Sequence, residues 1–179
     1  MAWTAPMTAV AGATFTAAQF NQYVRDNLNE TAPAKATAAG QFFVSTGANA
    51  IAARQLTSQV IVTSQTTTST SFTDLATVGP RVTAATSDRA LILFASQLDN
   101  TATNGAASVS VEVSGATTIG ASNDWRIVRD GVASGNPHRY GSAHLFTGLT
   151  PGNNTFTMKY VVGSGTGTFA ARELIVLPC

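Results

Sequence analysis

The chain has 179 residues, of which only 11% are Asp, Glu, Lys or Arg, and its formal net charge is +1. Typical soluble domains carry about 25% charged residues, so we expect a surface that is polar but mostly uncharged. The near-zero net charge excludes the electrostatic footprint that binding to nucleic acid or to an anionic membrane requires.

Membrane insertion and disulfide bonding are not indicated either. No 18 apolar residues run together, so we expect no membrane-spanning helix. The first fifteen residues have no basic start and no apolar run, so we expect no secretory signal peptide. The single cysteine, Cys179, cannot form an intrachain disulfide, and we interpret it as incidental, with a reactive thiol as the alternative.

Residues 1–15 are predicted to be an extended arm, because Pro6 and Gly12 interrupt any helix. Four apolar side chains are spaced along this arm, namely Trp3, Met7, Val10 and Phe15. Trp3 should either fold back on the following helix or insert into a neighbouring subunit. We favour the neighbour, because terminal arms are disordered unless they are tied down.

The range 16–29 is predicted to be a helix. Thr16 fits an N-cap, Gln19 completes a capping box, and Phe15 and Phe20 fit a hydrophobic staple. One stripe at helical spacing then contains Phe20, Tyr23, Val24, Asn27 and Leu28. A helix of about 13 residues is marginal in water when isolated. The stripe therefore needs a partner, which could be the arm, copies of the helix in an oligomer, or another protein.

Two further weak elements follow the helix. Residues 31–40 form a linker without periodicity, and two short apolar runs, 41–45 and 48–52, flank Thr46-Gly47. The first run contains Phe42 and Phe43. An isolated hairpin is marginal at best. We therefore predict that residues 1–57 are an attachment region, with an extended arm, one short helix and a small β-repeat or linker.

From Ser58 onward the pattern is that of short strands. The strands are predicted at 60–62, 71–78, 81–84, 89–99, 108–114, 125–128, 138–146, 155–162 and 168–177. The ranges 89–99 and 174–177 are apolar on both faces, which predicts strands that are buried on both sides. Two ranges alternate, with Val109, Val111, Val113, Phe156, Met158, Tyr160 and Val162 inward and Ser110, Glu112, Thr157 and Lys159 outward.

This spacing of strands and turns predicts a mainly β fold in which residues 58–179 form a jelly-roll-like antiparallel β-sandwich. The predicted sheet edges lack the lysines and inward charges that usually deter edge pairing. We therefore predict a homo-oligomer, and specifically a homotrimer.

Catalytic chemistry is weakly supported. His138 and His144 lie on one side of a predicted strand, and with Asp124 or Asp130 they could build a metal site or a triad. However, no G-x-S-x-G elbow, no H-E-x-x-H motif and no zinc-type spacing is present. We expect surface or inter-protomer histidines, no enzyme activity, no cofactor and no metal.

Three other features have an ordinary interpretation. The range 163–167 is rich in glycine, but it joins two predicted strands and opens no helix, so we expect a hairpin loop and no phosphate site. Asp74, Asp99 and Asp124 are scattered and do not indicate calcium. Trp125 and Tyr140, with Phe146, could form a surface that stacks on a glycan, although we favour core packing of these aromatic rings.

Motifs along the chain resemble phage proteins. Trp3, Ala11-Gly12, Thr16-Ala17-Ala18, Asn21 and Val24-Arg25-Asp26-Asn27-Leu28 resemble the N-terminal module of many proteins of tailed phages and prophages. The ranges 39–44, 46–47 and 53–54 are similar to short β-repeats of phage fibre and tail proteins. The ranges 74–80, 113–118 and 147–156 resemble a β-sandwich domain common among virion surface proteins of phages that infect actinobacteria.

The resemblance implies a non-enzymatic virion structural protein that is assembled in the host bacterial cytoplasm and lies at the virion surface. The absence of a repeat shaft favours a trimeric capsid decoration or head fibre protein that binds the major capsid protein or another virion protein. The alternative is a minor tail protein, that is, a tail or baseplate fibre or adhesin that binds host surface glycans. A cell-wall hydrolase that uses His138 and His144 is the least supported hypothesis.

The attachment residues are expected among the apolar side chains of residues 1–57 and the polar residues that flank them and fix the register. These are Trp3, Val10, Phe15, Phe20, Tyr23, Val24, Arg25, Asp26, Asn27, Leu28, Phe42 and Phe43.

Overall fold

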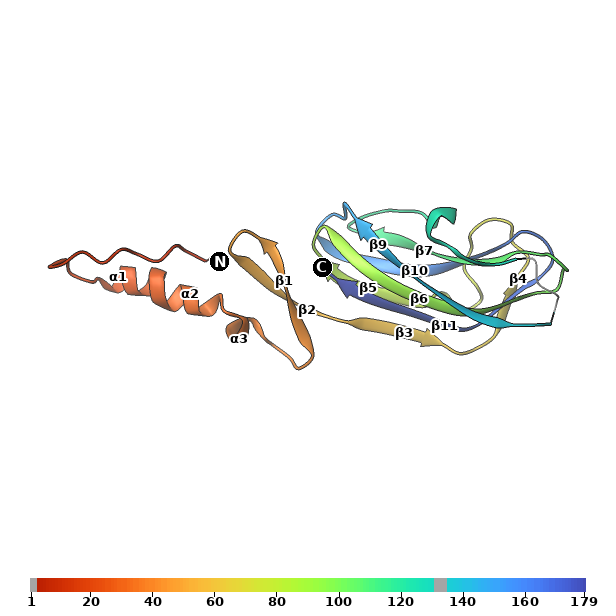
Figure 1. Cartoon of the computed structure of the whole chain (residues 1–179), viewed down its shortest axis with the longest axis horizontal. Helices are drawn as coiled ribbons and strands as arrows, with labels where there is room; N and C mark the ends of the chain where they lie inside the picture. Colours follow the sequence, from red (N-terminus) through yellow and green to blue (C-terminus); the bar gives the residue numbers. More distant parts are fainter. Residues whose placement is uncertain (1–2, 131–134) are drawn as a thin grey trace. The chain divides into compact units, whose positions relative to one another are not determined.

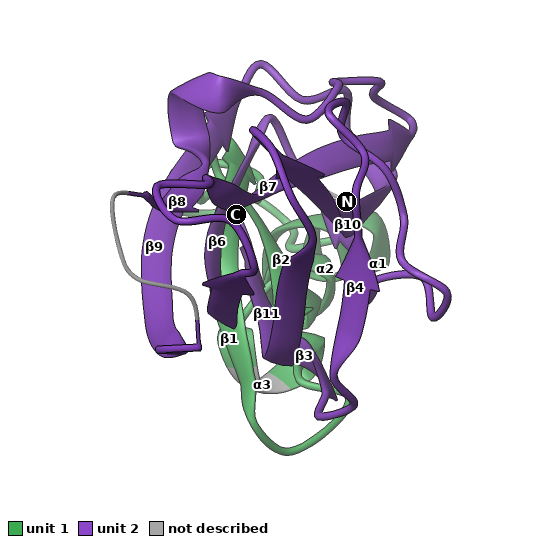
Figure 2. Ribbon diagram, turned by 90° about the vertical axis from the view of Figure 1, so that its right-hand side faces the viewer, with its two compact units in different colours: residues 1–55 green, residues 56–179 purple. Residues whose placement is uncertain are grey.

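The computed structural model describes residues 3–130 and 135–179 (Figure 1). The chain divides into two compact units, residues 1–55 and residues 56–179 (Figure 2). The boundary expected from the sequence lay between residues 57 and 58. Each unit is described by itself, as unit 1 and unit 2.

Unit 1 contains the predicted helix, but one turn of it is wider than an α-helical turn. The helix consists of α1 (Ala17–Phe20), the π-helical turn η1 (Asn21–Arg25) and α2 (Asp26–Asn29), which follow one another directly. The N–H of Asp26 donates to the carbonyl of Asn21, five residues earlier. A π turn rotates the side chains before it relative to those after it, so the stripe predicted from a 3.6-residue period does not lie on a single face.

The linker prediction for residues 31–40 is wrong in its first half, because a short helix, α3 (Ala32–Lys35), forms there. Its sequence has a proline in the first turn, where the missing N–H costs no hydrogen bond and the fixed φ suits a helix. A four-residue helix is too short to show apolar periodicity, which is why the pattern missed it.

The two apolar runs form a hairpin of β1 (Gln41–Gly47) and β2 (Ala50–Gln55), paired antiparallel. The chain reverses at Ala48 and Asn49, two residues later than the separation expected at Thr46-Gly47. Asn49 has a φ of 55°, in the left-handed region that asparagine tolerates better than most residues. The register shift between Ser45 and Gly47 moves the turn along the chain.

Unit 2 is an antiparallel β-sandwich. Its elements are β3 (Thr57–Ile61), β4 (Gln65–Thr67), β5 (Arg81–Thr86), β6 (Arg89–Asn100), β7 (Ala107–Gly115), the 3-10 turn η2 (Asn123–Trp125), β8 (Ile127–Arg129), β9 (His138–Thr147), β10 (Gly152–Val162) and β11 (Gly167–Pro178). One sheet has the order β5-β10-β7-β8, and the other has the order β3-β11-β6-β9, with β4 also paired to β11.

The strand order is that of a jelly roll. Because β3 and β4 both pair with β11, they act as one interrupted edge strand. Counted in this way, there are eight strand positions, and successive ones lie in different sheets except for β7 and β8, which pair with each other in one sheet. This is the arrangement of a double-sheet jelly roll. The predicted mainly β, jelly-roll-like antiparallel sandwich is confirmed.

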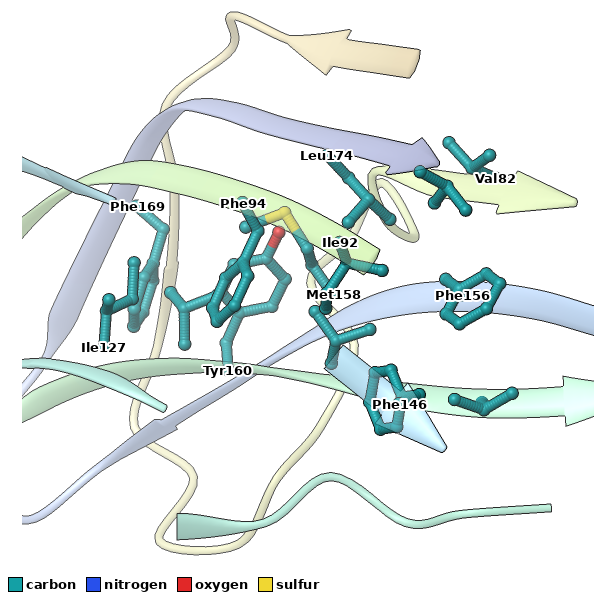
Figure 3. Packing of buried hydrophobic residues seen from close by; sticks show 14 of the residues in the cluster. Val82, Ile92, Phe94, Ile127, Phe146, Phe156, Met158, Tyr160, Phe169 and Leu174 are labelled. Atoms are coloured by element: carbon teal, nitrogen blue, oxygen red, sulfur yellow. The ribbon is translucent and has the colours of Figure 1, made fainter. Parts of the chain in front are cut away.

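The core lies between the two sheets (Figure 3). Phe156, Met158 and Tyr160 of β10 point into it and are fully buried. The inward positions predicted for β7 and for Val162 are buried as well, which confirms the alternation. Two positions predicted to be outward, Ser110 and Thr157, are also buried.

The burial of Ser110 has a local cause. Its hydroxyl donates to the carbonyl of Ser122 at 2.8 Å and accepts from the N–H of Ser122 at 3.2 Å. The loop that contains Ser122 therefore covers the outer surface of β7 at this point. A period-two pattern cannot reveal such a loop, because the covering residues lie twelve positions away in the sequence.

Two strand predictions are corrected. The range 71–78 is not a strand, because only Thr73 forms a bridge, to Tyr160 of β10. Strand β6 and the end of β11 are not buried on both sides; they alternate between buried and partly or fully exposed residues. Each sheet of a two-layer sandwich has one covered face, so apolar residues on the outer face, such as Leu93, stay exposed.

Several smaller features complete unit 2. The range 163–167 joins β10 to β11, as predicted. Cys179 is partly buried, and its N–H donates to the carbonyl of Arg89 at 3.1 Å. Over the described part of the chain, no helix is long and apolar enough to cross a membrane.

Candidate assembly surface in the N-terminal unit

The helix of unit 1 begins with two local devices that the sequence predicts. The Thr16 hydroxyl accepts the N–H of Gln19 at 3.2 Å, and the Gln19 side chain accepts the N–H of Thr16 at 2.9 Å. The rings of Phe15 and Phe20 meet edge to face, with centroids 6.2 Å apart. The capping box and the contact expected of a hydrophobic staple are both present.

Asn27 holds the arm against the helix. Its side-chain oxygen accepts the N–H of Thr4 at 2.9 Å, and its side-chain nitrogen donates to the carbonyls of Thr4 at 2.9 Å and Tyr23 at 3.1 Å. The neighbouring N–H of Trp3 donates to the carbonyl of Asn49 in the hairpin turn at 2.9 Å. The start of the arm therefore folds back within its own unit, although the side chain of Trp3 remains partly exposed.

Over its described residues, unit 1 has no apolar interior of its own. In the described part of unit 1, only Asn27 and Glu30 are classed as buried, and both are polar. Glu30 forms an ion pair with Lys35 at 3.0 Å. Burial of apolar side chains is the main favourable term in folding. The stability of unit 1 therefore depends on helix caps, hydrogen bonds and contacts between partly buried side chains.

Its large apolar side chains point instead to the surface. Val10 is 68% exposed, Phe15 52% and Phe20 48%. Val10 and Phe15 line a hollow of about 350 Å³ together with Met7, Ala13 and Gln19. We call Val10, Phe15 and Phe20 the arm–helix surface. Fully burying a large apolar side chain contributes about 1.5–3 kcal/mol, so covering each half-exposed ring would contribute about 1 kcal/mol.

The remaining predicted attachment residues are dispersed over unit 1. Trp3, Leu28 and Phe43 are exposed, and Tyr23, Val24 and Phe42 are partly buried. Arg25 is exposed and pairs with its neighbour Asp26 at 2.8 Å.

The sequence pattern did not reveal the partners of Asn27, namely Thr4 and Tyr23, because backbone groups carry no signal in a side-chain pattern. It also missed the role of Asn49, although an asparagine next to a short apolar run was a usable turn signal.

In unit 2, Trp125, a candidate for binding a glycan, packs against other residues of the chain. Its indole N–H donates to the carbonyl of Val111 at 3.0 Å. Its ring stacks on His144, with centroids 4.9 Å apart, and meets Phe146 edge to face at 5.4 Å. Tyr140 is also partly buried against the core, and it contacts His138 edge to face at 6.2 Å. The two residues thus contact different histidines of β9.

His144 packs between aromatic rings, whereas His138 is exposed beside Tyr140. His138 and His144 lie opposite Leu98 and Ile92 of β6. Burial lowers the pKa of His144, which favours the neutral imidazole beside the Trp125 ring. The carboxylate of Asp124 accepts a hydrogen bond from the Ser122 hydroxyl at 2.9 Å. Among the described residues, it forms no hydrogen bond or ion pair with a histidine. In the part of the chain that the structure describes, no group of three or more His, Cys, Asp and Glu side chains could hold a metal ion.

Comparison with known proteins adds a fold likeness only. No family model and no curated protein matches the chain. Among solved structures, the chain is similar to a chain in the structure of infectious bursal disease virus, Gx strain, with 11% identity and a TM-score of 0.48. The match covers 74% of this chain and 35% of that one, so the chain spans about a third of the length of that relative. At this identity and TM-score the likeness assigns neither family nor function, and the jelly-roll assignment follows from the sheet order above.

Proposed function

We propose that the chain is a non-enzymatic structural protein of a phage virion, a homotrimeric capsid decoration or head fibre protein. Unit 1 attaches it to the major capsid protein or another virion protein. Unit 2 is the outward-facing β-sandwich.

One observation carries this proposal. The described part of unit 1 buries no large apolar side chain, whereas unit 2 has a core of more than a dozen. A segment with an ordered helix and hairpin but no interior of its own gains stability when a partner covers its apolar side chains. The arm–helix surface of Val10, Phe15 and Phe20 supplies such a site. The resemblance of this segment to phage N-terminal modules favours a virion protein as that partner.

The surface of unit 2 supports a structural role rather than a catalytic one. Of the two histidines that could have served a hydrolase, His144 stacks on Trp125, and His138 is exposed with its ring edge to face with Tyr140. The edge strand β9 spans ten residues and contains neither lysine nor proline, two of the usual deterrents to edge pairing. Symmetric assembly would cover such an edge, which is why the proposal includes a homo-oligomer.

Deletion tests the proposal directly. Removing residues 2–55 takes away unit 1 and leaves every strand of unit 2. We expect the shortened chain to keep a β-sheet circular dichroism spectrum and to be absent from particles assembled in its presence. Incorporation of the shortened chain at the wild-type level would refute attachment through unit 1.

A pair of point variants tests the surface itself. Phe20→Ser removes a half-exposed ring of the arm–helix surface, and Gln22→Ser changes an exposed polar residue of the same helix. We expect at least a tenfold loss of particle occupancy for Phe20→Ser and no loss for Gln22→Ser. Equal occupancy of the two variants would exclude this surface as the attachment site.

A further inference from the structure

The outer face of the sheet that contains β3, β11, β6 and β9 is apolar over several strands. In the register of this sheet, Leu93 lies opposite Ala143 of β9 and Ile175 of β11. Leu91 lies opposite Leu145 and Leu177 in the same way. Paired residues on adjacent strands point to the same side of a sheet. These side chains therefore form one continuous patch, which we call the outer apolar face.

The outer apolar face is open to solvent. Leu93 is 43% exposed and Leu145 is 47% exposed, although both lie within long strands. The neighbouring strand β3 adds Val60, which is also exposed. Scattered apolar residues are normal on a protein surface, whereas a contiguous patch of this kind marks an interaction site.

The charged side chains on this face do not favour a charged partner. Arg139 of β9 pairs with Glu173 of β11, and Arg89 pairs with Asp88 at 3.0 Å. Each positive group is thus matched by a negative group within the chain. The net charge of the whole chain is only +1, so two copies can approach without marked repulsion.

The face also contains both a projection and a hollow. The hollow has a volume of about 350 Å³ and is lined by Leu93, Ala95, Gly141, Glu173 and Ile175, among others. The small residues Ala95 and Gly141 lie opposite each other there. Leu145 is on the same side of β9 as Gly141 and four residues further on, or about 13 Å along the strand. A surface that offers both an exposed leucine and an apolar hollow is complementary to itself.

We propose that the outer apolar face docks against a second copy of this chain, with Leu145 of one copy seated in the hollow beside Gly141 of the other. The inference rests on the homo-oligomer of the proposed function and names the surface that forms it. If the contact is made mutually it closes a dimer, and if it is made head to tail it can close a ring such as a trimer.

The size of the face sets the expected strength of the contact. Four strands about 4.8 Å apart and seven residues of about 3.3 Å each cover roughly 440 Å². Specific interfaces of standard size bury about 800 Å² per partner. The contact is therefore of the weaker class, and attachment of several copies to one particle would strengthen it by raising their effective concentration. Self-association of the purified chain should accordingly depend on its concentration.

Sedimentation of the full-length chain over a range of concentrations tests the inference. We expect Leu145→Glu and Gly141→Leu to raise the concentration for half-association at least tenfold. The first removes the projection and the second fills the hollow. Val128→Glu is the matched control, because Val128 is 40% exposed on β8 of the other sheet, and it should leave association unchanged. Circular dichroism of each variant verifies that the fold is kept.

A cross-linking experiment tests the contact pair and does not depend on fold disruption. Cys179 is the only cysteine, so a Cys179→Ser background is free of thiols. Chains with Leu145→Cys are mixed with chains that carry Gly141→Cys and oxidised. We expect a disulfide between unlike chains, and none when Val128→Cys replaces Leu145→Cys.

Three results would overturn the inference: a wild-type chain that stays monomeric at every concentration, association that survives Leu145→Glu, or no cross-link between unlike chains. Particle binding is scored separately. A Leu145→Glu chain that is monomeric and still joins particles would support this face as the contact between copies and would show that attachment through unit 1 does not need that contact. Sedimentation of the wild-type chain that reaches dimers but never trimers would support the face and contradict the homotrimer.

Discussion

The guanidinium of Arg172 lies 5.5 Å from the centre of the Tyr160 ring, and the two side chains donate to the same carbonyl, that of Gly79, at 3.1 Å and 2.8 Å. Both side chains are fully buried. Arg172 also donates to the side chain of Gln65 at 2.9 Å and to the carbonyl of Thr63 at 3.3 Å. The buried guanidinium of Arg172, on β11, thus connects the segment between β3 and β5 to Tyr160 of β10.

We expect Arg172→Met to lower the free energy of unfolding by about 2–3 kcal/mol. Methionine can fill the volume, but it removes the donor of the Thr63 carbonyl and one of the two donors of the Gly79 carbonyl, and the loss of hydrogen bonds from a charged group to buried acceptors is costly. Denaturant unfolding followed by circular dichroism measures the loss. Arg89→Met removes an exposed ion pair instead and should leave the midpoint nearly unchanged. Equal midpoints for the two variants would contradict the structural role of Arg172.

Tyr160 should make the fold sensitive to alkali. Burial raises the pKa of Tyr160 to about 12, from 10.0 for a free tyrosine. Its contribution to stability is therefore complete below pH 10, and it is lost as the pH rises from about 10 to 12, because only the unfolded chain ionises there. Two pH units correspond to about 3 kcal/mol.

Unfolding measured at increasing alkaline pH tests this prediction in Tyr160→Phe, which should lose most of the alkaline decrease in stability. The control is Tyr140→Phe, which changes a partly buried tyrosine and should keep the decrease. A Tyr160→Phe chain with the wild-type alkaline dependence would show that another group is responsible.

His144 should contribute a weaker dependence on the acid side. Burial lowers the pKa of His144, so protons bind more readily to the unfolded chain. The contribution to stability is therefore present above the ordinary histidine pKa of about 6.5 and is lost as the pH falls below it. His144→Phe can keep the contacts with Trp125 and Phe146. In this variant the midpoint of thermal unfolding should change less than in the wild type between neutral and mildly acidic pH. His138→Phe serves as the comparison, and an identical effect of both would argue against burial as the cause.

Asn27→Ala should release the arm without unfolding the rest of the chain. The change removes the three hydrogen bonds of the Asn27 side chain to Thr4 and Tyr23. The local cost is about 2 kcal/mol, since one N–H and two carbonyls that are partly buried lose their partner. Hydrogen exchange of the Thr4 and Trp3 amides should accelerate about 30-fold. Asn29→Ala, an exposed change in the same helix, should leave these rates as they are; unchanged exchange in Asn27→Ala would mean that Asn27 does not hold the arm.

Several features of this protein follow from its sequence alone. The alternation in β7 and β10 identifies the inward side chains, because successive residues of a strand point to opposite faces. The capping box at Thr16 and Gln19 is equally local, since both partners lie within one turn. Three short elements in succession also indicate that unit 1 has little interior of its own. Most of the apolar side chains that lie on its surface could be named from the same sequence pattern.

Only the tertiary structure decided the features that depend on distant segments. Leu93 and Ile92 look alike in the sequence, yet one faces solvent and the other the core, because the second sheet covers a single face of β6. Ser110 is buried by a loop that no periodicity announces, and the range 71–78 lies beside β10 with a single bridge instead of forming a strand. Nothing in the sequence distinguishes Arg172, which is buried because the connection between β3 and β5 brings the carbonyls of Thr63 and Gly79 to its guanidinium. Periodicity reports which way a side chain points, whereas burial depends on what the rest of the chain places in front of it.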